Sequence, residues 1–157
     1  MKKVTQSLTA AAIALAMSGF VHANGNGNHG KPCSDATLQG QYIFSASGFS
    51  IVAGVAQPRA IVELIRFHGD GTLSVPAGTL SVNGVITRVG GGSGPAGTYA
   101  IAADCTGSLA FGPPGPTFDL YPAPSGSEVH MIFTGGPVPG LGVVPGVFQG
   151  VADRLSR

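Results

Sequence analysis

Glycine and proline interrupt this chain at short intervals, and the segments between them alternate apolar with polar residues. The 157 residues include 26 Gly and 12 Pro. After residue 33, about eight such segments follow one another at a spacing of roughly 8–12 residues, which is typical of antiparallel sheets. The pattern predicts an all-β protein, a single antiparallel eight-stranded barrel, because closure leaves no exposed strand edge. An antiparallel β-sandwich is the alternative.

The clearest predicted hairpin covers residues 97–111, with apolar residues alternating on both arms and a turn at residues 104–107. Its turn contains Cys105, and Cys33 is the other cysteine of the chain. An even pair in an exported chain predicts a disulfide. The bond would close a loop of about 70 residues and contribute roughly 4 kcal/mol of stability. A free catalytic thiol is the alternative.

The N-terminus is typical of a secretory signal peptide over residues 1–23. Lys2 and Lys3 precede a short apolar run at residues 8–17, and Val21-His22-Ala23 ends in a small residue suited to cleavage. The run is shorter than the roughly 20 apolar residues that span a bilayer, so no membrane span is expected after cleavage; an uncleaved anchor is the alternative. We expect export from a bacterium to the periplasm or medium. Residues 24–32 are expected to be a flexible leader and residues 33–157 the barrel domain.

The strand predicted at residues 59–68 contains the most informative single residue. Its alternation places Glu63 on one face with three apolar residues, Ile61, Ile65 and Phe67. If that face points into the barrel, burial raises the pKa of the Glu63 carboxyl. The alternatives are an ion pair with Arg66 or Arg88, and a strand turned so that Glu63 faces solvent.

The motifs that most enzymes need are missing from the sequence. There is no Gly-x-Ser-x-Gly nucleophile motif, and the glycine run at residues 90–96 leads into a strand instead of a phosphate-binding helix. His68 and His130 are too far apart in sequence to form a recognisable zinc motif. Glu63 and Glu128 have opposite strand phases, which disfavours a glycosidase carboxylate pair. We therefore expect no catalytic residues, no metal and no cofactor.

Charge is sparse, with eight Lys and Arg against seven Asp and Glu and a formal net charge of +1. The basic residues form no stripe, so nucleic acid is not an expected partner. A surface of this composition, rich in Gly, Ser, Thr and Pro, is common in secreted β-proteins.

Residues 33–42 (CSDATLQGQY), residues 67–71 (FHGDG) and the hairpin motifs at residues 97–99 (GTY) and 104–107 (DCTG) carry a resemblance. They resemble a group of small exported bacterial proteins of unassigned function with a lipocalin-like or allene-oxide-cyclase-like barrel. Residues 40–42 are also similar to the Gly-x-Trp motif of lipocalins, with Tyr in place of Trp. The resemblance implies a barrel over residues 33 to 111 and, by analogy, ligand binding; it implies no catalytic residues.

Three hypotheses for function follow. The first is a binding protein for a small apolar ligand, with Glu63, Tyr42, Tyr99 and Phe67 as the candidate ligand-binding residues. The uncharged apolar loops expected at residues 48–56 and 137–145 would cover the pocket, contact a partner or close the barrel end. The second is a structural or surface-interaction protein. The third is a barrel isomerase or cyclase that uses Glu63 as its acid or base; the sequence leaves the oligomeric state open.

Overall fold

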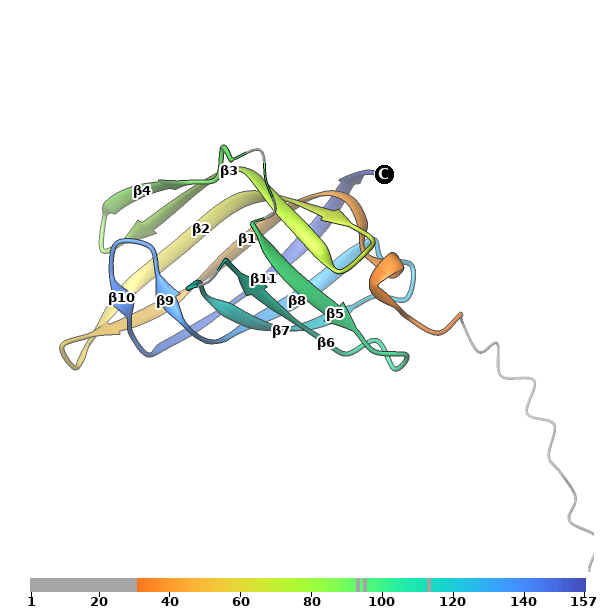
Figure 1. Ribbon diagram of the computed structural model, residues 1–157. Coiled ribbons are helices and arrows are strands. Elements are labelled where there is room, and N and C mark those ends of the chain that lie inside the picture. The colour runs from red at the N-terminus through yellow and green to blue at the C-terminus, as the bar shows by residue number, and fades with distance from the viewer. Residues whose placement is uncertain (1–30, 93, 95, 113) are drawn as a thin grey trace, which may run out of the picture.

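The computed structural model describes residues 31–92, 94, 96–112 and 114–157. This part of the chain contains eleven strands and one short 3-10 helix, whose arrangement is drawn in Figure 1. The predicted signal peptide and residues 24–30 of the predicted leader lie outside the described residues. The elements are η1 (Asp35–Thr37), β1 (Gln39–Val52), β2 (Val55–His68), β3 (Thr72–Val82), β4 (Val85–Val89), β5 (Gly97–Ile101), β6 (Gly107–Phe111), β7 (Thr117–Pro122), β8 (Glu128–Gly135), β9 (Pro137–Val138), β10 (Gly142–Val143) and β11 (Gly146–Ser156).

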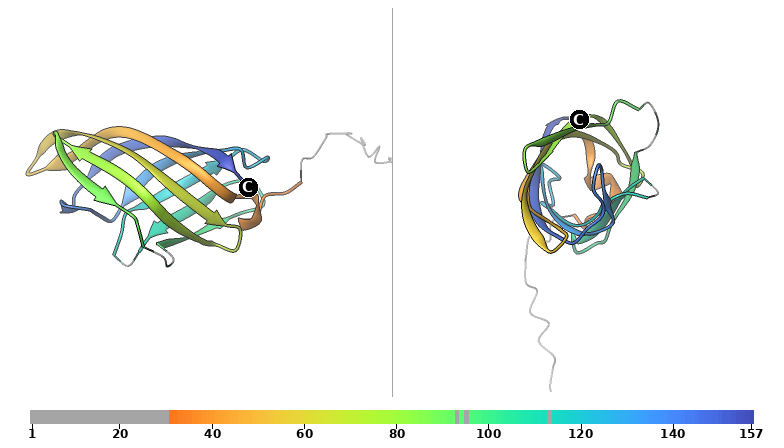
Figure 2. Two further views of the ribbon diagram at one scale, coloured as in Figure 1. Left: turned by 90° about the horizontal axis from the view of Figure 1, so that it is seen from above. Right: turned by 90° about the vertical axis from the view of Figure 1, so that its left-hand side faces the viewer.

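Eight of these strands form a closed antiparallel barrel, as the alternation predicts. The hydrogen-bonded order runs β2-β1-β11-β8-β7-β6-β5-β3, and a β2–β3 pairing closes the ring seen end-on in Figure 2. Strand β4 is additional and pairs with β3, while β9 and β10 form a separate two-stranded sheet. The barrel therefore replaces the β-sandwich alternative.

The structure corrects the prediction of an apolar loop at residues 48–56. This segment continues β1 and β2, which pair along their whole length up to Val52 and Val55. The turn consists of Ala53 and Gly54, whose φ values of 50° and 78° match a two-residue hairpin turn with positive φ at both positions. No proline or asparagine marks this turn, so the sequence carries only a weak signal for it.

The barrel core comes from the inward-facing residues of every strand in the ring. On β2, burial alternates from Arg59 to Phe67, which confirms the predicted phase of that strand. Aromatic rings from distant strands meet inside: Phe118 of β7 has edge-to-face contacts with Phe44 of β1 and Phe133 of β8. One contiguous cluster fills most of the interior.

The predicted disulfide is present and ties the segment before η1 to the β5–β6 hairpin. Cys33 and Cys105 have Cα atoms 5.1 Å apart and are 72 residues apart in sequence. The Asp35 carboxylate accepts a hydrogen bond from the Ile101 backbone N–H at 2.7 Å, and Leu38 is fully buried. The η1 segment therefore closes the barrel end at which β1 begins, on the right in Figure 1.

The described part of the chain contains no helix with the length and hydrophobicity of a membrane span.

Candidate functional site

A cavity of about 190 Å³ lies inside the barrel, on the far side from the end that the η1 segment closes. Its walls come mainly from apolar and aromatic side chains of seven strands. The residues that line it are Phe44, Arg59, Ile61, Glu63, Val75, Leu80, Val89, Gly90, Ala96, Phe111, Pro116, Phe118, Pro139 and Phe148. Among them, Arg59 and Glu63 have the only ionisable side chains.

Glu63 points into this cavity and is 6% exposed, as the strand phase predicts. Burial raises the pKa of its carboxyl to about 7, although the positive charge of Arg59 acts to lower it. The neighbouring strand makes room for this side chain with Gly78, where an added Cβ would lie 2.6 Å from the Glu63 Cβ. The two arginines considered from sequence, Arg66 and Arg88, are exposed instead.

Arg59 is the site residue that sequence reasoning missed. It lies four residues before Glu63 on β2, so both side chains face the same side of the strand, and it is only 4% exposed. Its guanidinium carbon lies 3.9 Å from the centre of the Phe148 ring and 5.5 Å from that of Phe133. The sequence could have indicated this position, because residues four apart on a strand share a face, but an arginine at the start of a strand is normally exposed.

The guanidinium of Arg59 lacks the hydrogen bonds that a buried cation usually has. Its Nε and Nη1 atoms are buried and find no hydrogen-bond partner among the described residues. Burial lowers the Arg59 pKa to about 10, with the Glu63 carboxylate acting in the opposite direction. At neutral pH the site therefore combines a cation with free N–H donors and a carboxyl that is close to half ionised. Such a pair can hold an anion and can give or take a proton.

The other three candidate residues are Tyr42, Phe67 and Tyr99, which lie together near the barrel end that the η1 segment closes. They are not among the residues that line the cavity. The Phe67 ring stacks edge-to-face between the two tyrosine rings, at 5.1 Å and 4.9 Å between centroids. The Tyr42 hydroxyl donates to the Gly126 carbonyl. Their role in ligand binding stays a prediction.

The Tyr99 hydroxyl group holds the η1 segment against the barrel end that this segment closes. This oxygen accepts a hydrogen bond from the Gly69 N–H at 3.0 Å and lies 2.9 Å from the Leu38 carbonyl and 3.0 Å from the Asp35 carbonyl, its possible acceptors. Burial raises the pKa of this hydroxyl to about 12, so it stays protonated at neutral pH. The contacts give Tyr99 a structural role at this end.

The end of the cavity away from η1 is covered by the β9–β10 hairpin, which lies within residues 137–145. Val138 is 2% exposed, and Pro139 in the connecting turn lines the cavity. Gly140 lies against β4, since a Cβ there would be 3.5 Å from the Thr87 hydroxyl oxygen. Figure 2 shows the hairpin across this end of the ring. The second predicted apolar loop, residues 48–56, forms the projecting tip of the β1–β2 hairpin instead.

The barrel wall is weakest beside the cavity, where β3 meets β5. The two strands pair only at Thr72–Thr98 and Leu73–Gly97 within the described residues. Past this point β3 pairs with β4 instead. Val89, Gly90 and Ala96 all line the cavity on this side, where the described residues form no β3–β5 ladder.

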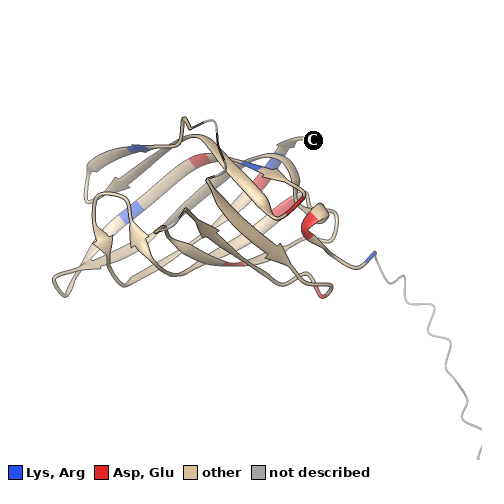
Figure 3. Ribbon diagram, viewed as in Figure 1, with Lys and Arg blue, Asp and Glu red and all other residues tan. Residues whose placement is uncertain are grey.

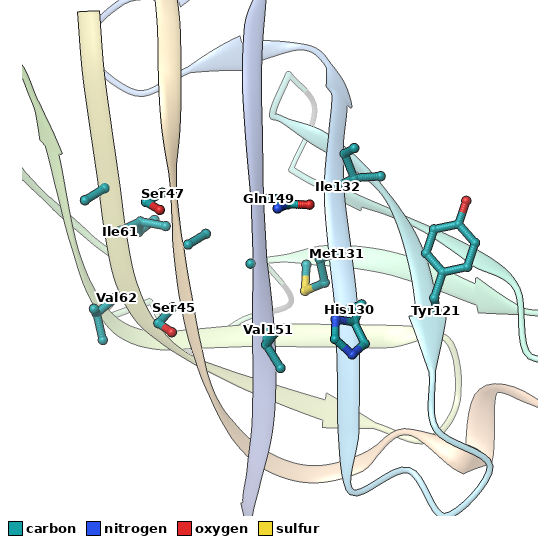
Figure 4. A pocket seen from close by; sticks show the side chains of 13 residues that line it. Ser45, Ser47, Ile61, Val62, Tyr121, His130, Met131, Ile132, Gln149 and Val151 are labelled. Atoms are coloured by element: carbon teal, nitrogen blue, oxygen red, sulfur yellow. The ribbon is translucent and has the colours of Figure 1, made fainter.

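A second hollow is on the outside of the barrel, across β2, β1, β11, β8 and β7. Figure 4 shows Ser45 and Ser47 of β1 on one side of β11, and His130 of β8 and Tyr121 of β7 on the other side. The His130 side chain points outward, and its Nε2 lies 2.7 Å from a Glu128 carboxylate oxygen. This hollow is open to solvent, and Figure 3 shows how few charged positions the whole barrel carries.

The described ranges contain no group of three or more His, Cys, Asp or Glu side chains placed to hold a metal ion. Comparison of the chain with protein-family models, with curated proteins and with solved structures gives no match in any of the three.

Proposed function

We infer that this protein binds a small, mostly apolar molecule inside its barrel. The observation that carries this function is the cavity of about 190 Å³ among core residues. Protein cores are packed about as densely as organic crystals and hold few voids larger than a water molecule. A void of this size, walled by aromatic rings and containing two ionisable groups, has the character of a ligand pocket.

The volume limits the ligand to roughly one ring or a short chain. A cavity of about 150 Å³ lined by aliphatic and aromatic side chains holds benzene. The interior of this barrel is thus large enough for a monocyclic compound, with the β9–β10 hairpin across one end and Val89, Gly90 and Ala96 along one side.

Toluene tests this function because it is uncharged and matches the volume. We expect saturable shifts of the amide NMR signals of residues that line the cavity, including Ala96 and Phe118. The Ala96→Leu variant fills part of the void and is expected to weaken toluene binding about tenfold or more. Ala96 suits this change because it is only partly buried.

Ala100→Leu is the matched control, because Ala100 is exposed on β5, four residues further along. It should leave toluene binding unchanged. Toluene shifts confined to the outer hollow, or equal affinity in the two variants, would contradict the interior site.

We propose export to the periplasm or medium as the setting for this function. The Cys33–Cys105 disulfide supports it, because such bonds persist in oxidising compartments. The predicted signal peptide at residues 1–23 also supports export.

A surface-interaction role is the second candidate, and the outer hollow favours it. Val62, Tyr121 and Ile132 line it with 50%, 50% and 42% of their surfaces exposed. Exposed apolar side chains gathered around one hollow are a feature of contact surfaces. Light scattering tests whether this surface binds a second copy of the chain. The mass of a single chain at high protein concentration would exclude self-association.

A further inference from the structure

We propose that the ligand of the barrel cavity carries a carboxylate, which pairs with the buried guanidinium of Arg59. The inference rests on the proposed interior binding function and names the chemical class of its ligand: a small carboxylic acid with one apolar ring or short chain. Arg59 lines the cavity, and its Nε and Nη1 atoms have no partner among the described residues.

The geometry of the guanidinium favours an anion in the cavity. The guanidinium carbon lies over the Phe148 ring, 3.9 Å from the ring centre. A guanidinium attracted to a ring in this way keeps N–H groups that do not point at the ring, and two parallel hydrogen bonds from such groups match a carboxylate. Phe148 therefore holds the cation in place without using its hydrogen-bond donors.

The Glu63 carboxyl does not take the place of this anion. No direct ion pair joins Arg59 and Glu63 in the described part of the chain, although the two face the same cavity. A buried cation whose donors are unpaired lowers the stability of the empty protein. An anionic ligand would remove that cost on binding, which is the physical reason for the predicted preference.

Glu63 makes this preference depend on pH. The other residues that line the cavity, from β1, β3, β4, β6, β7, β11 and the connecting segments, have no titratable side chains, so Arg59 is the one charged group that faces Glu63 there. Burial raises the Glu63 pKa to about 7. Below this pH the neutral carboxyl does not repel a bound carboxylate, and above it the ionised form does.

Benzoate, benzamide and toluene form the test set, since they share one ring and differ in charge and polarity. At pH 6 the full chain should bind benzoate about tenfold to a hundredfold more tightly than benzamide, the gain expected for charge-assisted hydrogen bonds. Benzoate stays ionised between pH 6 and 8, and its affinity should fall over that range. The Glu63→Gln variant should lose this dependence on pH.

The Arg59→Met variant tests the role of the positive charge, because methionine keeps an apolar side chain at this position and has no charge. It should bind toluene as the parent protein does and bind benzoate no better than benzamide. Arg66→Met is the matched control: it removes a positive charge from the same strand, but Arg66 is exposed on the outside of the barrel. It should keep the benzoate preference.

The outcomes separate the two proposals. If none of the three compounds binds, the interior binding function itself is wrong. If toluene binds but the parent protein shows no preference for benzoate, the carboxylate inference is wrong and the binding function stands. A benzoate preference that persists in Arg59→Met, or that disappears in Arg66→Met, would also overturn the role of Arg59.

Discussion

Arg59 and Glu63 are the buried members of the Lys, Arg, Asp and Glu side chains in the described part of the chain, and each alters the pKa of the other. Burial disfavours the charged form of both, so it lowers the Arg59 pKa to about 10 and raises the Glu63 pKa to about 7. Their mutual attraction offsets only part of this, because the two do not meet in a direct ion pair. Groups that weaken a core in this way are characteristic of binding sites.

The raised pKa of Glu63 predicts a specific dependence of stability on pH. The folded protein holds the Glu63 proton up to about pH 7, whereas the unfolded chain releases it near the ordinary value of 4.5. Because the folded state binds more protons between these values, the Glu63 contribution to the free energy of unfolding is complete below about pH 4.5 and falls as pH rises to 7. The loss is about 3 kcal/mol over this window.

The Glu63→Gln variant measures this contribution, because glutamine has nearly the same shape and does not ionise. Urea unfolding of both proteins from pH 4 to 8 should give similar stabilities at the acid end and a more stable variant at the alkaline end. Other carboxylates titrate equally in both proteins, so the difference isolates Glu63. A constant difference across the range would show that Glu63 keeps an ordinary pKa.

Among the strands, β1 shows how closely the barrel wall is built. At Gly40 the backbone has a φ of 116°, and the pairing of β1 with β11 shifts register just after it, between Gln41 and Tyr42. A Cβ at this position would lie 2.0 Å from the carbonyl oxygen of Ser156. Gly40 therefore lets the two strands approach closely, as its position early in the first strand predicts.

The Gly40→Ala substitution is expected to lower the free energy of unfolding by about 3 kcal/mol, because it combines backbone strain with a clash against a backbone atom that cannot move freely. Urea unfolding at neutral pH measures it. Gly92→Ala is the control, since a Cβ at Gly92 meets nothing within 4 Å. Equal stabilities for the two variants would show that β11 yields without cost at Gly40.

The barrel as a whole is closed differently at its two ends. The η1 end is fixed by the disulfide and by the hydrogen bonds of Tyr99 and Asp35. The other end is covered by the β9–β10 hairpin, and on the side toward this end β3 pairs with β4 instead of β5. We expect ligand access at this second end, because local opening favours regions with few backbone hydrogen bonds.

Removal of the disulfide tests the contribution of the closed end to global stability. The double variant Cys33→Ala, Cys105→Ala should lose about 4 kcal/mol, because the bond limits the freedom of a long loop in the unfolded chain. Urea unfolding without reductant compares it with the parent protein. Reductant should destabilise the parent protein and leave the double variant unchanged; a double variant within about 1 kcal/mol of the parent would contradict this role.

Local patterns were enough to predict much of this fold. The period of two in the strand at residues 59–68 correctly put Glu63 on the same face as Ile61, Ile65 and Phe67, and the structure shows that this face is the inner one. The disulfide followed from the number of cysteines and the predicted compartment. These features depend on neighbours in the sequence, because strand phase and turn conformation arise from a few consecutive residues.

The site required contacts that no local pattern contains. Arg59 stacks on Phe148, a residue of the last barrel strand, and the cavity exists because β3 leaves β5 to pair with β4. The full length of the β1–β2 hairpin also became visible only in the register of its paired strands. Strand order and register are set by packing across the whole ring. Residues far apart in the chain therefore determined the shape of the cavity that the Arg59 and Glu63 side chains line.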